Sequence, residues 1–403
     1  MGEYNVKYWR LFHHNGESTV EYKKGFINII PGLGYWLIAR EPVPIETGEG
    51  RTVRLDSITN GYNLNLEPGW NQIGNPFDID IWWNEVIYYN QNLNIGRVRL
   101  YTADSLSEGN IIPRFRGGFV FLKGDAPVTV QLRPEIVSAV ARRQQYVDQD
   151  RFNSLDEPSW IAGLKISNGS VTNTLSGIGM HPEAKEGKDW HDEPLMPVPR
   201  EIIPFELAFN HPHEKYDKFS LDVTQTTDQY IWDFEVNSFL EGQKLTINWD
   251  NKHFGDNNLN LILNHKGIEK LIDMKELNSY SFKGSDINQF RIIFGDDSFV
   301  GEHIKPETIT FGNGYPNPFR EVVTIPFTLP DSESEYMVTV NVYDLTGNLV
   351  KQLSNDHYDP GYYTLTWNSL ESSKTIRNGI YIIRMSVQSE KINTTLIRKV
   401  LKY

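Results

Sequence analysis

The sequence predicts an all-β protein built of tandem β-sandwich or jelly-roll-like domains that ends in a small seven-strand sandwich. The 403 residues include 10 Trp, 20 Tyr and 20 Phe, together with 31 Gly and 21 Pro. Aromatic residues favour strands, and Gly and Pro favour the turns between them. Apolar and polar residues also alternate, so that Trp232, Phe234 and Val236 fall on one face of a strand.

Four segments can be distinguished along the chain, in keeping with about 100–200 residues per domain. Residues 1–136 are predicted to form a duplicated β-rich accessory domain, and residues 137–157 a connector. Residues 158–302 are predicted to form a jelly-roll-like β-sandwich interrupted by one long irregular loop at about 167–203. Residues 308–403 are predicted to form the final small sandwich.

The duplication in the first domain rests on short patterns that recur in the same order with variable spacing. Each copy reads as a strand, a turn, an aromatic strand and a polar strand. The matched pairs are residues 9–12 with 98–101, residues 34–38 with 118–122, and residues 52–53 with 129–130.

Charge and composition exclude several classes of function. The formal net charge is −13, and an acidic surface repels phosphate backbones, so we expect no nucleic-acid partner. The absence of Cys excludes disulfides, zinc–thiolate sites, iron–sulfur clusters and a Cys nucleophile. No apolar stretch reaches the roughly 18 residues of a transmembrane helix.

The first residues carry no basic segment followed by an apolar run, so they do not form a signal peptide. If the chain is secreted, its signal must lie upstream. We therefore expect the sequence to be the C-terminal part of a longer protein.

The last domain contains a series of strand and turn motifs. Asp344 and Gly347 lie in a predicted hairpin turn, and Gly379 follows Asn378 in a second turn. The motifs are YPNPF at residues 315–319, TIPFTLP at 324–330, VYDLTG at 342–347, GYYTLTW at 361–367, GIYIIRM at 379–385 and a basic tail at 395–403.

In order and spacing these motifs resemble the type A C-terminal sorting domain of the type IX secretion system, and the related immunoglobulin-like domain of the flagellar hook-capping protein. One departure is Asn368-Ser369 after Trp367, where the family more commonly has Asp-Gly. The resemblance implies an immunoglobulin-like sandwich. It assigns the sorting signal to Pro316, Asn317, Pro318, Phe319, Asp344, Gly347, Gly379, Tyr381 and the tail, which carries Arg398, Lys399 and Lys402.

The resemblance also implies a destination and partners. Such domains direct export across the outer membrane of Bacteroidota-type bacteria, so a secreted or cell-surface location is expected. The implied partners are the type IX secretion machinery, a cell-surface sortase and anionic lipopolysaccharide. The terminal strand is expected to offer a cationic edge to a receptor sheet, although lysines also simply protect edge strands.

A polar cluster is the best candidate for a site in the middle of the chain. His181, Asp189, His191, Asp192 and Glu193 lie close together in sequence. Clustered carboxylates bind calcium, so Asp189, Asp192 and Glu193 are predicted as calcium ligands. The spacing matches no helical zinc motif, and such residues also form ordinary solvated loops.

Paired aromatic residues suggest a second kind of site. Alternation along a strand would expose one residue of Trp82-Trp83 and one of Tyr88-Tyr89, which could stack on the sugar rings of a polysaccharide. Trp36 and Trp70 are expected to be core residues.

These observations favour a non-catalytic C-terminal region of a secreted or surface protein, with any catalytic domain upstream. No catalytic residue is assigned, because the sequence contains neither a G-x-S-x-G elbow nor a phosphate-binding P-loop. Two alternatives stay open: a carbohydrate-binding or adhesive surface protein, and a hydrolase that uses the 181–193 loop.

Overall fold

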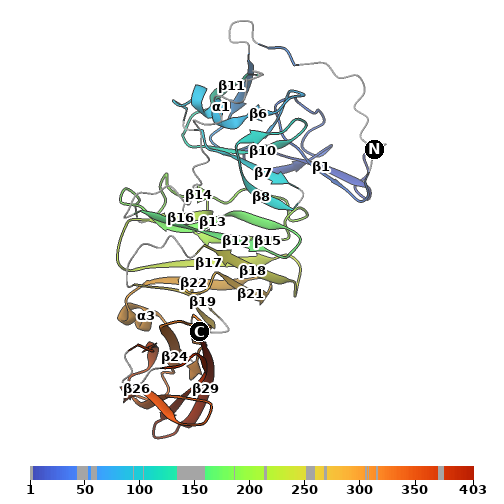
Figure 1. Cartoon of the computed structure of the whole chain (residues 1–403). Coiled ribbons are helices and arrows are strands. Elements are labelled where there is room, and N and C mark those ends of the chain that lie inside the picture. Colours follow the sequence, from blue (N-terminus) through green and yellow to red (C-terminus); the bar gives the residue numbers. More distant parts are fainter. Residues whose placement is uncertain are drawn as a thin grey trace. The chain divides into compact units, whose positions relative to one another are not determined.

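The computed structural model describes most of the chain as strands and connecting turns (Figure 1). The described residues are 3–42, 53–55, 61–93, 95–102, 104–133, 159–185, 187–212, 216–250, 259–266, 270–304, 306, 308–314, 316–370 and 376–403. The chain divides into two compact units, the first made of residues 1–226, 234–255 and 279–288, and the second of residues 227–233, 256–278 and 289–403.

The predicted all-β class is confirmed. Within the described residues, the helices are α1 (Trp83–Tyr89) and α3 (Asp297–His303), each of seven residues. The predicted connector at residues 137–157 and Tyr315 lie outside the described residues.

The N-terminal part of the first unit contains small sheets and one end of a large sheet. The small sheets have the orders β2-β1-β3, β4-β11 and β6-β9, and the large sheet ends in β8-β7-β10-β5. A core that includes Leu66, Trp83, Val98, Val120 and Val130 is shielded from water. The strands are β1 (Trp9–His14), β2 (Thr19–Glu21), β3 (Trp36–Ala39), β4 (Tyr62–Leu66), β5 (Gly69–Gly74), β6 (Ile81–Trp82), β7 (Val98–Thr102), β8 (Ser105–Gly109), β9 (Ile111–Ile112), β10 (Gly117–Leu122) and β11 (Val128–Leu132).

The two copies of the internal repeat pair their strands similarly but not identically. β1 pairs antiparallel with β3, and the corresponding β7 pairs antiparallel with β10. Leu11 lies opposite Leu37, whereas its counterpart Leu100 lies opposite Gly118, so the registers differ. The third matched pair cannot be compared, because residue 52 lies outside the described residues.

The rest of the first unit is organised around β13. This strand pairs antiparallel with β12 and parallel with β16. It also pairs parallel with β8, where Thr172 lies opposite Ser105. The strands are β12 (Trp160–Ser167), β13 (Thr172–Met180), β14 (Glu193–Pro194), β15 (Phe205–Asn210), β16 (Lys218–Thr224), β17 (Tyr230–Ser238, with residues 234–238 in this unit), β18 (Lys244–Trp249) and β21 (Ser279–Lys283).

Two sequence-based expectations are therefore corrected. The accessory region and the following strands share a sheet through β8 and β13, rather than forming two independent domains. The interval 167–203, expected to be one irregular loop, contains β13 and β14. Small residues weaken the strand signal of β13. At Gly179 a Cβ would lie 2.6 Å from the Trp160 carbonyl oxygen, so the close pairing with β12 requires glycine.

The second unit contains residues 230–233 of β17 and the strands β19 (Asn260–His265), β20 (Lys270–Asp273) and β22 (Asn288–Gly295, with residues 289–295 in this unit). β20 and β22 pair antiparallel with β19. Helix α3 follows, and the Asp296 side chain caps it by accepting the Phe299 N–H at 2.8 Å. The strands that were predicted to form one domain at residues 158–302 are thus divided between the two units. The helix α3 was not predicted.

The last domain is a two-layer sandwich of seven strands, as predicted. One sheet has the order β23-β24-β27 and the other β26-β25-β28-β29. Ile325, Val340, Trp367, Ile383 and Val400 are among the buried residues between the layers. The strands are β23 (Thr310–Phe311), β24 (Val322–Leu329), β25 (Tyr336–Tyr343), β26 (Leu349–Tyr358), β27 (Gly361–Asn368), β28 (Gly379–Gln388) and β29 (Asn393–Lys402).

Removing the central indole should destabilise this domain. Trp367 is 1% exposed, and its ring centroid lies 5.2 Å from that of Phe319 and 5.1 Å from that of Tyr381. Trp367→Ala should lower the free energy of unfolding by about 3–5 kcal/mol. Hydrogen exchange measured by mass spectrometry should show reduced protection in β24, β27 and β28. Leu370→Ala, at a position that is 67% exposed, is the control and should change little.

Candidate functional site

The terminal strand β29 is held between two neighbours. One edge pairs antiparallel with β28 along its whole length, from Asn393 to Lys402. On the other edge, the Phe319 N–H donates to the Leu401 oxygen at 2.8 Å, and the Tyr403 N–H donates to the Phe319 oxygen at 3.0 Å. The main-chain edge at the end of β29 is therefore already paired.

Asn317 completes this arrangement with its side chain. Its Oδ1 accepts the Leu401 N–H at 2.8 Å, and its Nδ2 donates to the Lys399 oxygen at 3.2 Å. The Asn317–Pro318 peptide is cis. The 316–319 motif thus clamps the end of β29. It occupies the Lys399 oxygen, both main-chain groups of Leu401 and the Tyr403 N–H, so the edge is not open there as predicted.

The three terminal cations have different surroundings. Lys402 Nζ donates to the Arg320 oxygen and lies 5.7 Å from the centre of the Phe319 ring. Arg398 lies with its guanidinium carbon 5.9 Å from the centre of the Phe311 ring. Lys399 is exposed. The tail is therefore not a uniformly cationic ribbon, because two of its cations lie against aromatic rings of the domain.

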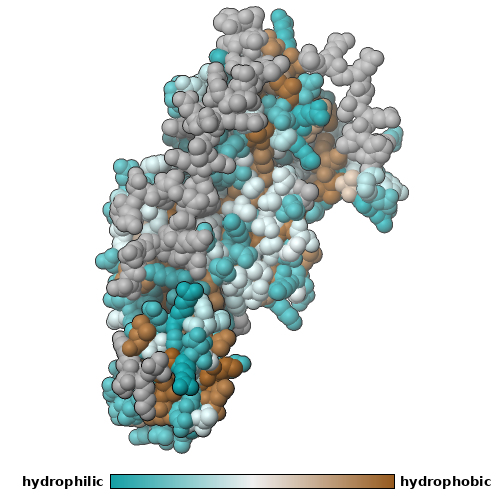
Figure 2. Space-filling model, viewed as in Figure 1, coloured by the Kyte–Doolittle hydropathy of each residue, from teal (hydrophilic) through white to brown (hydrophobic). Residues whose placement is uncertain are grey.

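Instead, β29 presents an amphipathic outer face. Ile397 is 54% exposed, Leu401 40% and Tyr403 54%, with exposed Lys399 between the two aliphatic residues. Figure 2 shows hydrophobic residues on the surface of this domain, at the bottom of the view, next to a hydrophilic stripe. The sequence of residues 396–401 could have predicted this exposed apolar face, because side chains alternate along a strand. Leu396 and Val400 point inward, and Ile397 and Leu401 point outward.

Asp344 and Gly347 build the turn between β25 and β26. Asp344 Oδ1 accepts the Thr346 and Asn348 N–H groups, each at 2.9 Å. Hydrogen bonds from Thr346 and Asn348 lower the pKa of Asp344 to about 2. Gly347 has φ +86°, a conformation that favours glycine.

Gly379 and Tyr381 shape the start of β28. Gly379 has φ +153°, and the buried Tyr381 donates its hydroxyl hydrogen bond to the Arg377 oxygen at 2.6 Å. Together with the turn, these residues shape the domain, whereas Ile397, Lys399 and Leu401 lie on the outer face of β29.

Comparison with known families agrees with this architecture. A family model described as "Secretion system C-terminal sorting domain" matches residues 313–399. Residues 313–399 form a type IX secretion system C-terminal sorting domain. The sorting domain marks the protein for export to the cell surface or extracellular space in Bacteroidota, through the type IX secretion machinery.

Structural comparisons of the whole chain are weak. One similar structure is dimeric latent PorU from Porphyromonas gingivalis, at 14% identity and a TM-score of 0.22, covering 85% of this chain and 31% of that one. Another is a tetra-tandem repeat in the extending region of a large adhesion protein, at 12% identity and a TM-score of 0.17, covering 86% of this chain and 96% of that one. No curated protein matches the sequence.

Upstream of the sorting domain, the predicted calcium ligands Asp192 and Glu193 have partners within the chain. Glu193 accepts two hydrogen bonds from the buried Arg99 guanidinium, at 2.9 and 2.6 Å. Asp192 Oδ1 accepts the Val223 N–H at 2.8 Å, and its Oδ2 accepts the Asp189 N–H at 2.7 Å. Burial raises the pKa of Asp192 to about 7. Two carboxylates of the predicted set, those of Asp192 and Glu193, thus bind groups of the chain itself, and calcium binding by Asp189, Asp192 and Glu193 stays a prediction.

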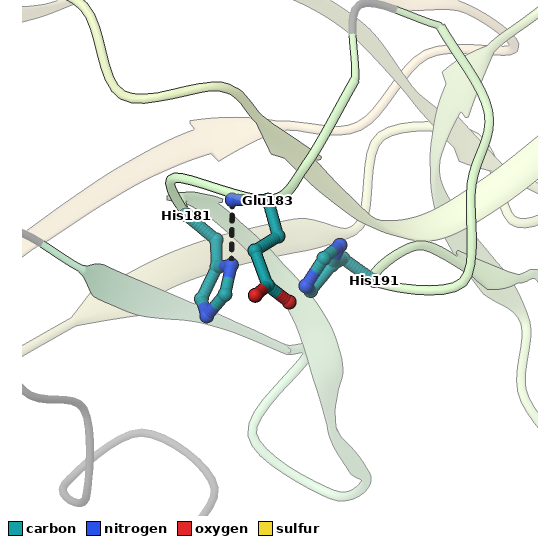
Figure 3. Close-up of side chains that lie close together, drawn as sticks. All are labelled: His181, Glu183 and His191. Atoms are coloured by element: carbon teal, nitrogen blue, oxygen red, sulfur yellow. Dashed lines mark hydrogen bonds between the residues drawn. The ribbon is translucent and has the colours of Figure 1, made fainter.

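A different group of side chains comes together in the same loop. His181, Glu183 and His191 place one potential ligand atom each within 4.8 Å of one another, the one such group within the described part of the chain. Figure 3 shows the Glu183 carboxylate lying between the two imidazole rings. Sequence reasoning selected both histidines but missed Glu183, although it lies two residues after His181.

The two predicted stacking tryptophans differ in their surroundings. Trp83 opens α1 rather than continuing a strand, is 0% exposed, and donates its indole N–H to the Gly96 oxygen at 3.0 Å. Trp82 is only partly exposed, whereas Tyr88 and Tyr89 are 54% and 40% exposed. One residue of the tryptophan pair is thus more exposed than the other, as alternation predicted, whereas both tyrosines are exposed because they lie in α1 and not in a strand.

Within the part of the chain that the structure describes, no helix is both long enough and apolar enough to cross a bilayer.

The Arg99–Glu193 pair supplies a test of the predicted calcium site. Their side chains are 6% and 7% exposed, and Glu108 also contacts Arg99, at 2.9 Å. Glu193→Gln should lower the free energy of unfolding by about 3–5 kcal/mol, toward the smaller value because Glu108 remains. Urea denaturation should show the same decrease in the free energy of unfolding whether chelator or calcium is added. Glu241→Gln, at an exposed position, should have little effect; a loss seen only with calcium present would support Glu193 as a ligand.

Proposed function

We propose that this chain is the non-catalytic C-terminal region of a type IX secretion cargo, and that the outer face of β29 is the surface read by the secretion machinery. The observation that carries this proposal is an exposed aliphatic pair, Ile397 and Leu401, on the terminal strand of a sorting domain. The other face of that strand packs against the core, where Val400 is 0% exposed.

The face extends onto the neighbouring strand. Leu401 lies opposite Ile380, Lys399 opposite Ile382, and Ile397 opposite Arg384. Side chains on paired strands form a continuous surface, so the apolar residues lie beside two cations. Such a surface suits a partner that offers an apolar contact with an acidic rim.

The accessory strands would then form a structural region between the sorting domain and any activity encoded upstream. A structural role is favoured because Glu193 binds Arg99 and Asp192 binds the Val223 N–H, so these acidic side chains already have partners within the chain. Cleavage by a cell-surface sortase and attachment to anionic lipopolysaccharide belong to the same proposal and rest on the family resemblance.

Export of surface variants tests the proposal. Ile397→Glu combined with Leu401→Glu should leave the chain folded but strongly reduce its appearance outside the cell. Each buried aliphatic contact is worth about 1.5–3 kcal/mol, so losing two should weaken recognition by more than about tenfold. The measurement is the ratio of intracellular to surface and medium protein in a secreting Bacteroidota host, with an upstream signal peptide supplied.

A charge-matched control separates recognition from unfolding. Gln352→Glu and Gln388→Glu add the same two charges at exposed positions of the same sheet and should be exported normally. Deleting residues 395–403 is a poorer test, since it removes the buried Val400 and most of β29. Normal export of the Ile397/Leu401 variant would remove the outer face as the recognition surface.

A second candidate function, carbohydrate binding, is supported by one pocket. It is lined by Trp82 and Tyr89 together with Glu85, Gln131 and Arg133. The Arg133 guanidinium carbon lies 4.9 Å from the centre of the Tyr89 ring, which holds the ring in place. Aromatic faces beside amide and charged groups suit the apolar faces and hydroxyls of a sugar.

Affinity gels containing different polysaccharides test this candidate. Trp82→Ala and Tyr89→Ala should each abolish most of any retardation of the wild-type chain, since an aromatic contact is worth about 0.5–1.5 kcal/mol beyond its burial. Phe115→Ala removes an aromatic residue that is 79% exposed and is not among those lining the pocket, and should leave the mobility unchanged. Equal retardation of all four proteins would exclude this pocket as the site.

A further inference from the structure

The loop between β13 and β14 holds a histidine that is prepared to bind a ligand. The His191 side chain is 9% exposed, and its Nε2 is buried with no hydrogen-bond partner. Its other ring nitrogen, Nδ1, lies 3.1 Å from Asp189 Oδ1. A proton on Nδ1, shared with this carboxylate, leaves the lone pair of Nε2 available.

Asp189 is itself held in place by the main chain. Its Oδ2 accepts the Lys185 N–H and its Oδ1 the His191 N–H, each at 2.7 Å. The loop is tied to β16 through Asp192, which bridges the Asp189 and Val223 N–H groups. A carboxylate that orients a histidine in this way is a recurrent feature around protein-bound metal ions.

His181 and Glu183 bring two more donors to the same place. The two imidazole centroids lie 4.3 Å apart, and all three side chains have a ligand atom within 4.8 Å of the others. Figure 3 shows the Glu183 carboxylate between the rings, from a turn in which the Glu183 N–H donates to His181 Nδ1 at 3.1 Å. If His181 binds the ion through Nδ1, the ion replaces this hydrogen bond. If it binds through Nε2, the ring proton moves to Nδ1, which can then no longer accept the Glu183 N–H.

We infer that His181, Glu183 and His191 form a binding site for a zinc ion, with Asp189 as a positioning residue. Two imidazole nitrogens and one carboxylate suit zinc, whereas calcium and magnesium prefer oxygen ligands. Three protein ligands leave the fourth position of a tetrahedral zinc ion to water or to a group on a bound molecule. This site is independent of the sorting function.

Calorimetric titration of the full chain with zinc, free of affinity tags and after chelator treatment, tests the inference. We expect one zinc ion per chain, and no displacement by a large excess of calcium. Glu183→Gln alters an exposed side chain and should preserve the fold, while weakening zinc binding strongly. His181→Ala and His191→Ala should also weaken zinc binding strongly. Asp189→Asn should weaken it by about 10–100-fold, the range for residues that orient metal ligands.

Two controls separate this site from surface histidines. His357→Ala removes an imidazole that is 58% exposed, and Glu241→Gln an exposed carboxylate, and neither should change zinc affinity. Cobalt in place of zinc should give a visible spectrum typical of nitrogen and oxygen ligands, lost in His191→Ala. No stoichiometric zinc binding, or binding that survives Glu183→Gln and both histidine variants, would overturn the inference.

Discussion

The pairing of β29 with β28 is the constraint on which the sorting domain depends. Because side chains alternate across a strand, the burial of Val400 at 0% exposure fixes Ile397, Lys399 and Leu401 on the opposite face. A shift by one residue would bury Lys399 and expose Val400. The register is further secured by Asn317 and Phe319, which bind the end of β29 from its other side. The same contacts that stabilise the fold therefore determine what the domain shows to a partner.

This arrangement changes the meaning of the sorting motifs. An unpaired edge could bind a receptor through main-chain hydrogen bonds, but at residues 399–403 the clamp by the 316–319 motif uses those groups. A partner that approached this end of β29 would therefore meet side chains rather than unpaired main-chain groups. Most residues assigned to sorting, such as Asp344 in its turn and Tyr381 in the core, contribute by holding the surface in its shape.

The sequence predicted well where side-chain periodicity and tertiary burial agree. Alternation in Trp232, Phe234 and Val236 correctly predicted that these side chains share one buried face of a strand. It failed at Tyr88 and Tyr89, which are both exposed because a seven-residue helix replaces the expected strand. Long-range partners were not predictable either: Arg99, which binds Glu193, lies 94 residues before it in the chain. Composition therefore identified the 181–193 loop, but only the three-dimensional structure shows that Glu183 lies close to His181 and His191.

Two histidines of this protein each have a buried, unpaired ring nitrogen, and their surroundings distinguish them. Most buried polar atoms in proteins have partners, so an exception calls for an explanation. His14 Nδ1 is such an exception, but burial lowers the pKa of His14 to about 4, and it belongs to none of the potential metal-binding groups found among the described residues. His191 Nε2 is also unpaired, yet it lies in the group with a second imidazole and a carboxylate, and Asp189 orients its ring. A neutral histidine in an apolar core needs no ligand, whereas an oriented histidine beside two further donors has the surroundings that a metal ion requires.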